Sequence, residues 1–122
     1  MLSALAAEHV HHPRNRGPIE NATAYGVAGE PGEGAYVQIW LVVEEDLIRQ
    51  AAFKTPGCPS STAAASVLCQ VVTGRTLEEA AGLTGDDLLV ILGGLPEGKE
   101  DYAFRAVDAL SNGLLSVSEV QR

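Results

Sequence analysis

The stretch Phe53-Lys54-Thr55-Pro56-Gly57-Cys58-Pro59-Ser60 joins an apolar run to an alanine-rich one. Gly57 favours a sharp turn because glycine tolerates positive φ, and Pro59 suits the first position of a helix. The stretch therefore predicts a β-strand followed by a helix that begins near Cys58. The open amides and the positive dipole end of such a helix favour a thiolate and lower its pKa. Cys58 is the candidate functional thiol; the alternative is a small capping residue without chemistry.

The residues on either side of this stretch predict a small antiparallel sheet. Alternating apolar residues mark the clearest strand, over residues 35–43. A weaker strand over residues 22–28 precedes it, across a glycine-rich turn at residues 29–34. A hairpin at residues 44–46 leads to a third strand over residues 47–54.

Helices are predicted at the start of the chain and throughout its second half. The N-terminal helix covers residues 2–12 and stops before Pro13, because the residue before proline avoids the α region. An alanine-rich helix follows over residues 60–73. Capping-box signals at Thr76 and Thr84 predict two shorter helices. A last long helix is predicted to begin near Lys99. Together these elements predict an α+β fold: an N-terminal helix, a small antiparallel three-stranded sheet, and a helical C-terminal half packed on the sheet.

Length, charge and cysteine spacing limit the classes of protein to which this chain can belong. A chain of 122 residues predicts a single domain over residues 1–122. The net charge of −8 argues against nucleic acid and against an anionic membrane surface as partners. On one helix, Cys58 and Cys69 would lie roughly 16 Å apart, whereas a disulfide needs Cα atoms about 4.4–6.8 Å apart. We therefore expect free thiols and a cytoplasmic location.

The three histidines, His9, His11 and His12, lie together in the first helix. His9 and His12 share a helix face and form a candidate metal pair. The alternative is a solvated helix end, which the lack of a third ligand nearby favours.

The order of these predicted helices, strands and turns resembles that of the U-type iron–sulfur cluster assembly scaffolds, which include IscU and the N-terminal domain of NifU. Glu8-His9 and residues 13–17 (PRNRG) are similar to the family's opening helix and its "NPRN-G" loop. Residues 52–58 (AFKTPGC) match its "A-x-F-K-T-x-G-C" segment, and residues 73–80 (TGRTLEEA) resemble the stretch that follows. The resemblance covers nearly the whole chain and implies a NifU-like α+β fold.

The resemblance also implies a set of ligands, of which this chain retains a part. Family members typically use three cysteines with a nearby aspartate and histidine. In the turn that holds the first cysteine, Glu33 stands at the cysteine position and Ala35 at the aspartate position. Cys58 is the second cysteine. At the third, Asp101 and Tyr102 replace the histidine and the cysteine.

This loss changes the cofactor that we expect. Soft thiolates are the usual ligands of iron–sulfur clusters, so an intact cluster is not expected on one chain alone. A cluster shared between two copies in a homo-oligomer, or completed by an outside thiol, stays open. Glu33, Cys58 and Asp101 together could bind one divalent ion, Zn or Fe, at an open tetrahedral site. Alternatively, the two carboxylates are only favourable partners of a helix dipole.

The resemblance implies a cysteine desulfurase as a partner. It does not imply the family's dedicated Hsp70-type chaperone, because residues 95–99 (LPEGK) depart from the "L-P-P-V-K" segment that this chaperone reads. The first hypothesis is a divergent, non-enzymatic scaffold-like protein whose Cys58 accepts a persulfide or binds a metal. The second is a binding or regulatory module that kept the fold and lost cluster binding. A small thiol enzyme, with a histidine beside Cys58, ranks third.

Overall fold

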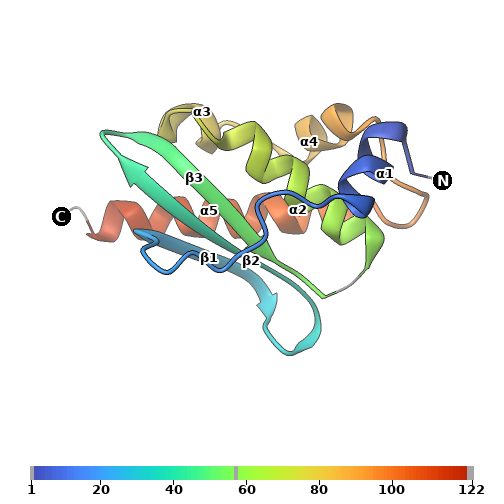
Figure 1. The fold of residues 1–122 in the computed structure, drawn as a ribbon, viewed down its shortest axis with the longest axis horizontal. Helices are drawn as coiled ribbons and strands as arrows, with labels where there is room; N and C mark the ends of the chain where they lie inside the picture. Colours follow the sequence, from blue (N-terminus) through green and yellow to red (C-terminus); the bar gives the residue numbers. More distant parts are fainter. Residues whose placement is uncertain (1, 57, 121–122) are drawn as a thin grey trace.

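The structure is a computed structural model that describes residues 2–56 and 58–120. The turn predicted at Gly57 lies outside the described residues. The elements follow the predicted order (Figure 1): α1 (Ala4–His11), β1 (Ala24–Glu30), β2 (Glu33–Glu44), β3 (Leu47–Lys54), α2 (Pro59–Val72), α3 (Leu77–Ala81), α4 (Gly85–Leu92) and α5 (Asp101–Val120).

The three strands form one antiparallel sheet in the order β1-β2-β3. In the middle of the sheet, Ile39 of β2 pairs with Gly26 of β1 on one side and with Phe53 of β3 on the other. The alternation read from the sequence places Val37, Ile39 and Leu41 fully in the core. The predicted α+β class is confirmed.

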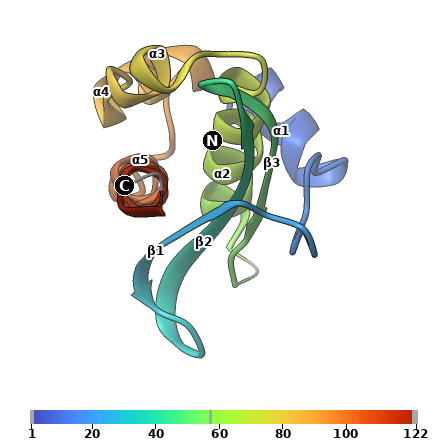
Figure 2. The same ribbon diagram turned by 90° about the vertical axis from the view of Figure 1, so that its left-hand side faces the viewer.

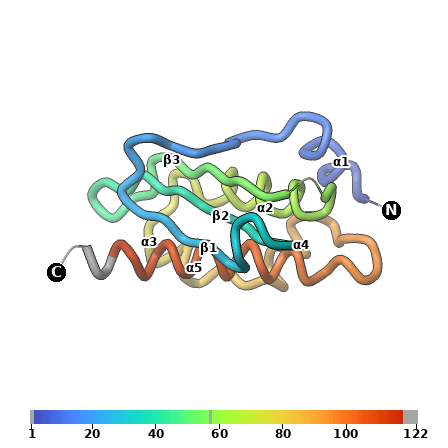
Figure 3. The backbone as a smooth tube through the Cα atoms, turned by 90° about the horizontal axis from the view of Figure 1, so that it is seen from below, coloured from blue at the N-terminus to red at the C-terminus, as the bar shows by residue number. Residues whose placement is uncertain are grey.

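The helices lie mainly over one face of the curved sheet. Figure 2 shows α2 and α5 on the same side of the strands, with α3 and α4 beyond them. The segment between α1 and β1 runs along the opposite side, away from α5 (Figure 3). It is joined to β3 by two backbone hydrogen bonds, from Gly17 N–H to the Phe53 carbonyl (2.8 Å) and from Phe53 N–H to the Asn15 carbonyl (2.9 Å). These bonds pair the backbone carbonyl and N–H of Phe53 on the outer edge of β3.

Helix α5 closes the other edge of the sheet. Asn112 Nδ2 donates to the Val27 carbonyl (2.8 Å), and the Tyr25 N–H donates to Ser116 Oγ (3.3 Å). Side chains of α5 thus satisfy backbone groups of β1 that no strand pairs, which protects an exposed strand edge from joining another chain.

The element boundaries differ from the predicted ones in a few places. The glycine-rich turn is tighter than expected, because β1 continues to Glu30 and β2 begins at Glu33. The start of α4 agrees with the prediction, because the helix begins at Gly85, directly after the predicted capping residue Thr84. Helix α5 begins at Asp101, two residues after the expected start near Lys99, and runs to Val120. Among the described residues, no helix is both long and apolar enough to cross a membrane.

Candidate functional site

Cys58 is the N-cap residue of α2, as the sequence predicts. Its backbone is extended (φ −67°, ψ 128°), Pro59 occupies the first turn, and the Cys58 carbonyl accepts the first helical hydrogen bond from the Thr62 N–H (3.0 Å). The thiol is half-buried and borders a cavity of about 180 Å³. The cavity is lined by Gly34, Ala35, Pro56, Cys58, Ser61 and Tyr102.

The surroundings of Cys58 favour the thiolate. Partial burial acts to raise the pKa of the thiol, but the Ser61 amide, the Tyr102 hydroxyl, the Ser60 amide and the Lys99 ammonium outweigh it and lower the pKa below its usual value. The side chain makes no N-cap hydrogen bond of normal geometry. The amides therefore act on the sulfur mainly as nearby positive dipoles at the start of the helix.

A hydroxyl pair holds the turn that carries Cys58 against the sheet. Thr55 Oγ1 donates to the Tyr36 carbonyl of β2 (2.7 Å) and is also hydrogen-bonded to Ser61 Oγ in the first turn of α2. The end of β3, the start of α2 and the start of β2 are therefore tied together around the cavity. Cys58 and Ala35 line this same cavity.

The other two predicted metal ligands lie apart from this cavity's lining. Glu33 is exposed, and Asp101 borders a separate cavity of about 300 Å³ together with Arg105 and Asp108. The part of the chain that the structure describes has no group of three or more His, Cys, Asp or Glu residues that could hold a metal ion. The site of Glu33, Cys58 and Asp101 stays a prediction to which the geometry adds no support. One thiolate does not fit the donor set of a cluster.

Tyr102 is the site residue whose role the sequence did not reveal. It replaces the family's third cysteine, and from sequence it is merely a poor metal ligand. In the structure it lines the Cys58 cavity, and its ring lies near two cations: Lys99 Nζ is 5.7 Å and Arg105 Cζ is 5.2 Å from the ring centroid. Lys99, Tyr102 and Arg105 are spaced three residues apart, and this spacing was the sequence signal that could have revealed the contacts of the Tyr102 ring.

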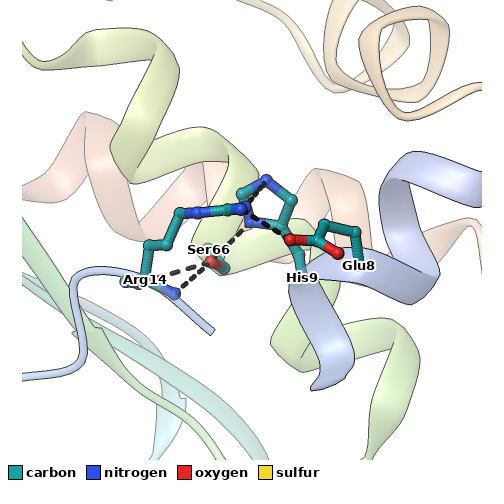
Figure 4. A network of polar contacts seen from close by, with 4 residues as sticks. All are labelled: Glu8, His9, Arg14 and Ser66. Carbon is teal, nitrogen blue, oxygen red and sulfur yellow. Dashed lines mark hydrogen bonds and ion pairs between the residues drawn. The ribbon is translucent and has the colours of Figure 1, made fainter. Parts of the chain in front are cut away.

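A polar network joins α1 to α2 on the side of the protein away from α5 (Figure 4). His9 is buried, and its Nδ1 lies 2.7 Å from Ser66 Oγ while its Nε2 lies 2.8 Å from Arg14 Nη1. Arg14 Nη2 also donates to Glu8 Oε1 (2.8 Å), and the Arg14 N–H donates to Ser66 Oγ (2.9 Å). The expectation of a solvated helix end is wrong for His9. The metal-pair alternative fails too, because both ring nitrogens of His9 are engaged.

The network determines the protonation state of His9. A guanidinium can only donate hydrogen bonds, so Nε2 must accept and Nδ1 must carry the proton that it donates to Ser66. Burial, followed by the charge of Arg14, lowers the pKa of His9, and Glu8 opposes them. His9 is therefore held as the neutral imidazole.

The lowered pKa of His9 predicts a loss of stability in mild acid. The unfolded chain takes up a proton near pH 6.5, where folded His9 does not, so the free energy of unfolding is greatest above that pH. It should fall by up to about 1.4 kcal/mol per pH unit below pH 6.5. Urea unfolding at pH 7.5, 6.5 and 5.5 measures this slope. His9→Gln should flatten it, and an equal slope in both proteins would contradict the assignment.

The two cysteines are unpaired, as predicted. Cys69 is fully buried in α2, and burial raises the pKa of its thiol. It packs as a small apolar side chain. Of the two cysteines, Cys58 is the half-exposed one and the one whose thiol pKa is lowered.

Comparison with known proteins agrees with this architecture. The family described as NifU-like N terminal domain matches residues 3–121. The chain is 35% identical over 115 residues to the iron-sulfur cluster assembly scaffold proteins IscU 1 and IscU 2 of Archaeoglobus fulgidus, covering 94% of this chain and 75% of each relative. It is 37% identical over 94 residues to the nitrogen fixation protein NifU of Azotobacter chroococcum, covering 75% of this chain and 30% of that protein.

A solved structure shares the fold. The N-terminal NifU-like protein from Brucella abortus superposes with a TM-score of 0.68 at 18% identity, over 96% of this chain and 94% of that one. The family match over residues 3–121 and the 35% identity to the IscU proteins show that the chain belongs to the NifU-like N-terminal domain family.

Proposed function

We propose that this protein takes part in iron–sulfur cluster assembly as a scaffold-like protein, without enzymatic activity of its own, and that Cys58 accepts sulfur from a cysteine desulfurase. The observation that carries the proposal is the placement of Cys58, half-exposed at the start of α2 with a lowered thiol pKa, beside a small cavity. The printed names of the IscU relatives support the role in cluster assembly.

Sulfur acceptance is a balanced exchange that needs one thiolate. The Cys58 thiolate attacks the outer sulfur of a persulfide on the donor protein. A new S–S bond forms at Cys58, the donor's S–S bond breaks, and the donor cysteine leaves as a thiolate. The proton on the transferred sulfur moves with it or is lost to water, and no external oxidant or reductant is required.

Sulfur acceptance suits the donors on this chain better than cluster binding. A cluster needs several thiolates, and Cys58 is the half-exposed one of the two here. A cluster would require ligands from a second copy or from a partner's thiol. Such a cluster would be cargo, delivered onward, and no step of the exchange above depends on it.

Cys58→Ser should abolish sulfur loading. The protein is incubated with a cysteine desulfurase and L-cysteine, and the mass gain of one sulfur atom is measured before and after a thiol reductant. The wild-type chain should gain the sulfur and lose it on reduction, because a persulfide is reducible. Cys69→Ala is the matched control and should load normally, since that thiol is buried. Equal loading of Cys58→Ser and the wild type would overturn the proposal.

A binding or regulatory module without metal or sulfur chemistry is the second candidate. It is favoured by one observation: the described residues bring no three candidate metal ligands together. Elemental analysis of protein purified without chelators separates the alternatives. Zinc or iron near one per chain that is lost in Cys58→Ser would support the metal-binding version of the first proposal, with Glu33 and Asp101 as further ligands. Metal-free protein that also fails to load sulfur would support the module.

A further inference from the structure

A second cavity lies between α3 and the C-terminal half of α5, at the end of the molecule away from the start of α2 (Figures 1 and 3). It has a volume of about 440 Å³ and is called the α3–α5 groove below. Its lining residues are Leu77, Glu78, Ala81, Ser111, Leu114 and Leu115. Among the described residues, it shares none with the cavity beside Cys58, so sulfur acceptance does not account for it.

The walls of the α3–α5 groove are apolar and reach the surface. Leu115 is 62% exposed, and Leu77 and Leu114 are half-buried. Leu77 and Ala81 form the wall that belongs to α3, and the two leucines of α5 form the other wall. Burial of such apolar surface is the main favourable term in most protein–protein association. Two apolar helical walls suit a third helix that lays its apolar face between them.

Carboxylates border the groove where it meets the turn between β2 and β3. The Leu77 N–H donates to the Asp46 carbonyl (2.9 Å), so this turn lies directly beside the wall formed by α3. Four exposed carboxylates lie on the turn and on the first turn of α3: Glu44, Glu45, Asp46 and Glu78. Arg49 of β3 offsets at most one of them, and Arg75 is paired with Glu79 (3.9 Å). The rim of the groove is therefore negative, in a chain whose net charge is −8.

We propose that the α3–α5 groove is a docking surface for a basic amphipathic helix of a partner protein. The apolar face of that helix displaces water from the leucines of the groove, and its Lys and Arg side chains pair with the carboxylates of the rim. A second copy of this chain fits less well, because it brings the same carboxylates against this rim. An anionic membrane surface is disfavoured for the same reason.

Binding of a synthetic peptide to the full chain tests the inference. The probe is a fluorescein-labelled peptide of Leu and Lys, about five helical turns long, with Leu at helical spacing along one face. One comparison peptide has Glu in place of Lys, and another has the Leu and Lys residues in scrambled order. Fluorescence anisotropy measures binding at about 50 mM and about 300 mM NaCl. The Leu/Lys peptide should bind about tenfold more tightly than either comparison peptide, and the higher salt concentration should weaken its binding.

Variants of exposed residues locate the binding surface without disturbing the core. Leu115→Gln removes an apolar side chain from the groove and should weaken binding of the Leu/Lys peptide by about tenfold. Glu78→Gln should weaken it by about two- to fivefold and reduce its dependence on salt. Val90→Gln is the matched control: Val90 of α4 is 81% exposed and is not part of the groove lining, so this variant should bind as the wild type does.

Four results would overturn the inference. They are the absence of binding at low salt, equal binding of the Leu/Lys peptide and either comparison peptide, equal losses in Leu115→Gln and Val90→Gln, and a wild-type dimer in sedimentation that Leu115→Gln dissociates. The last result would assign the groove to a second copy of the chain. Because no sulfur donor takes part, failure of sulfur loading would contradict the proposed function and leave peptide binding unaffected.

Discussion

Replacing Gly26 by alanine is expected to destabilise the protein by about 3 kcal/mol or more, near the upper end of what overpacking usually costs. A Cβ atom at Gly26 would lie 2.1 Å from the Ala109 carbonyl oxygen and 2.2 Å from the Gly113 nitrogen, both in the backbone of α5. A backbone cannot rotate aside as a side chain can. Strand β1 and helix α5 would have to separate, and the melting temperature should fall by roughly 10–15 °C in a thermal unfolding experiment.

Substitutions at two further glycines provide controls for this prediction. A Cβ at Gly113, on the other side of the same contact, meets Gly26 N at 3.3 Å, so Gly113→Ala should cost clearly less than Gly26→Ala. Gly82 has a negative φ of −81° and its nearest neighbour lies 3.6 Å away. Gly82→Ala should change stability by less than about 1 kcal/mol. If the Gly26→Ala and Gly82→Ala variants had the same melting temperature, the result would contradict the close approach of β1 and α5.

Ser66→Ala should cost about 3 kcal/mol, because one buried hydroxyl serves three partners. Ser66 is fully buried; its Oγ accepts from His9 Nδ1 and from the Arg14 N–H, and it donates to the Arg14 carbonyl. Alanine would leave two donors unpaired, each at a cost of about 1–3 kcal/mol. Urea unfolding at pH 7.5 measures the loss.

A double-mutant cycle distinguishes a network from independent contacts. If Ser66 and His9 act together, Ser66→Ala should cost about 1 kcal/mol less in a His9→Gln background than in the wild type. Ser111→Ala, at an exposed position of α5, is the control and should stay within about 0.5 kcal/mol. Additive losses would show that Ser66 and His9 do not act as one unit.

Much of the fold could be predicted from local patterns. Strand β3 runs from Leu47 to Lys54 as predicted, since its ends are marked by a turn and by Pro56. The capping box of Thr76 and Glu79 forms as predicted, because its two hydrogen bonds lie within four residues. The tight turn between β1 and β2 was harder to place, because strand pairing across it extends into residues of low β-propensity.

The candidate site, too, could be predicted only in part from the sequence. The position of Cys58 at a helix start follows from its own neighbours, Gly57 and Pro59. The partners of that thiol do not, because which side chain of α5 faces the cavity depends on the rotation of a helix more than 40 residues away. The family resemblance made Asp101 the candidate ligand, whereas the helix places Tyr102 at the cavity and Asp101 at another one. The burial of His9 was likewise missed, because its partners Arg14 and Ser66 are brought to it by the packing of α1 on α2.

Motifs such as residues 52–58 were enough to indicate the family. The α+β order of elements and the thiol at the start of α2 follow from short-range periodicity, turn residues and capping signals, which are local in the chain. Three features depend on tertiary packing: Tyr102 borders the cavity of that thiol, His9 is buried as a neutral imidazole, and Gly26 lies against the backbone of α5. Each of these depends on how two elements distant in the chain are oriented when they pack, and that orientation is set by the whole core together.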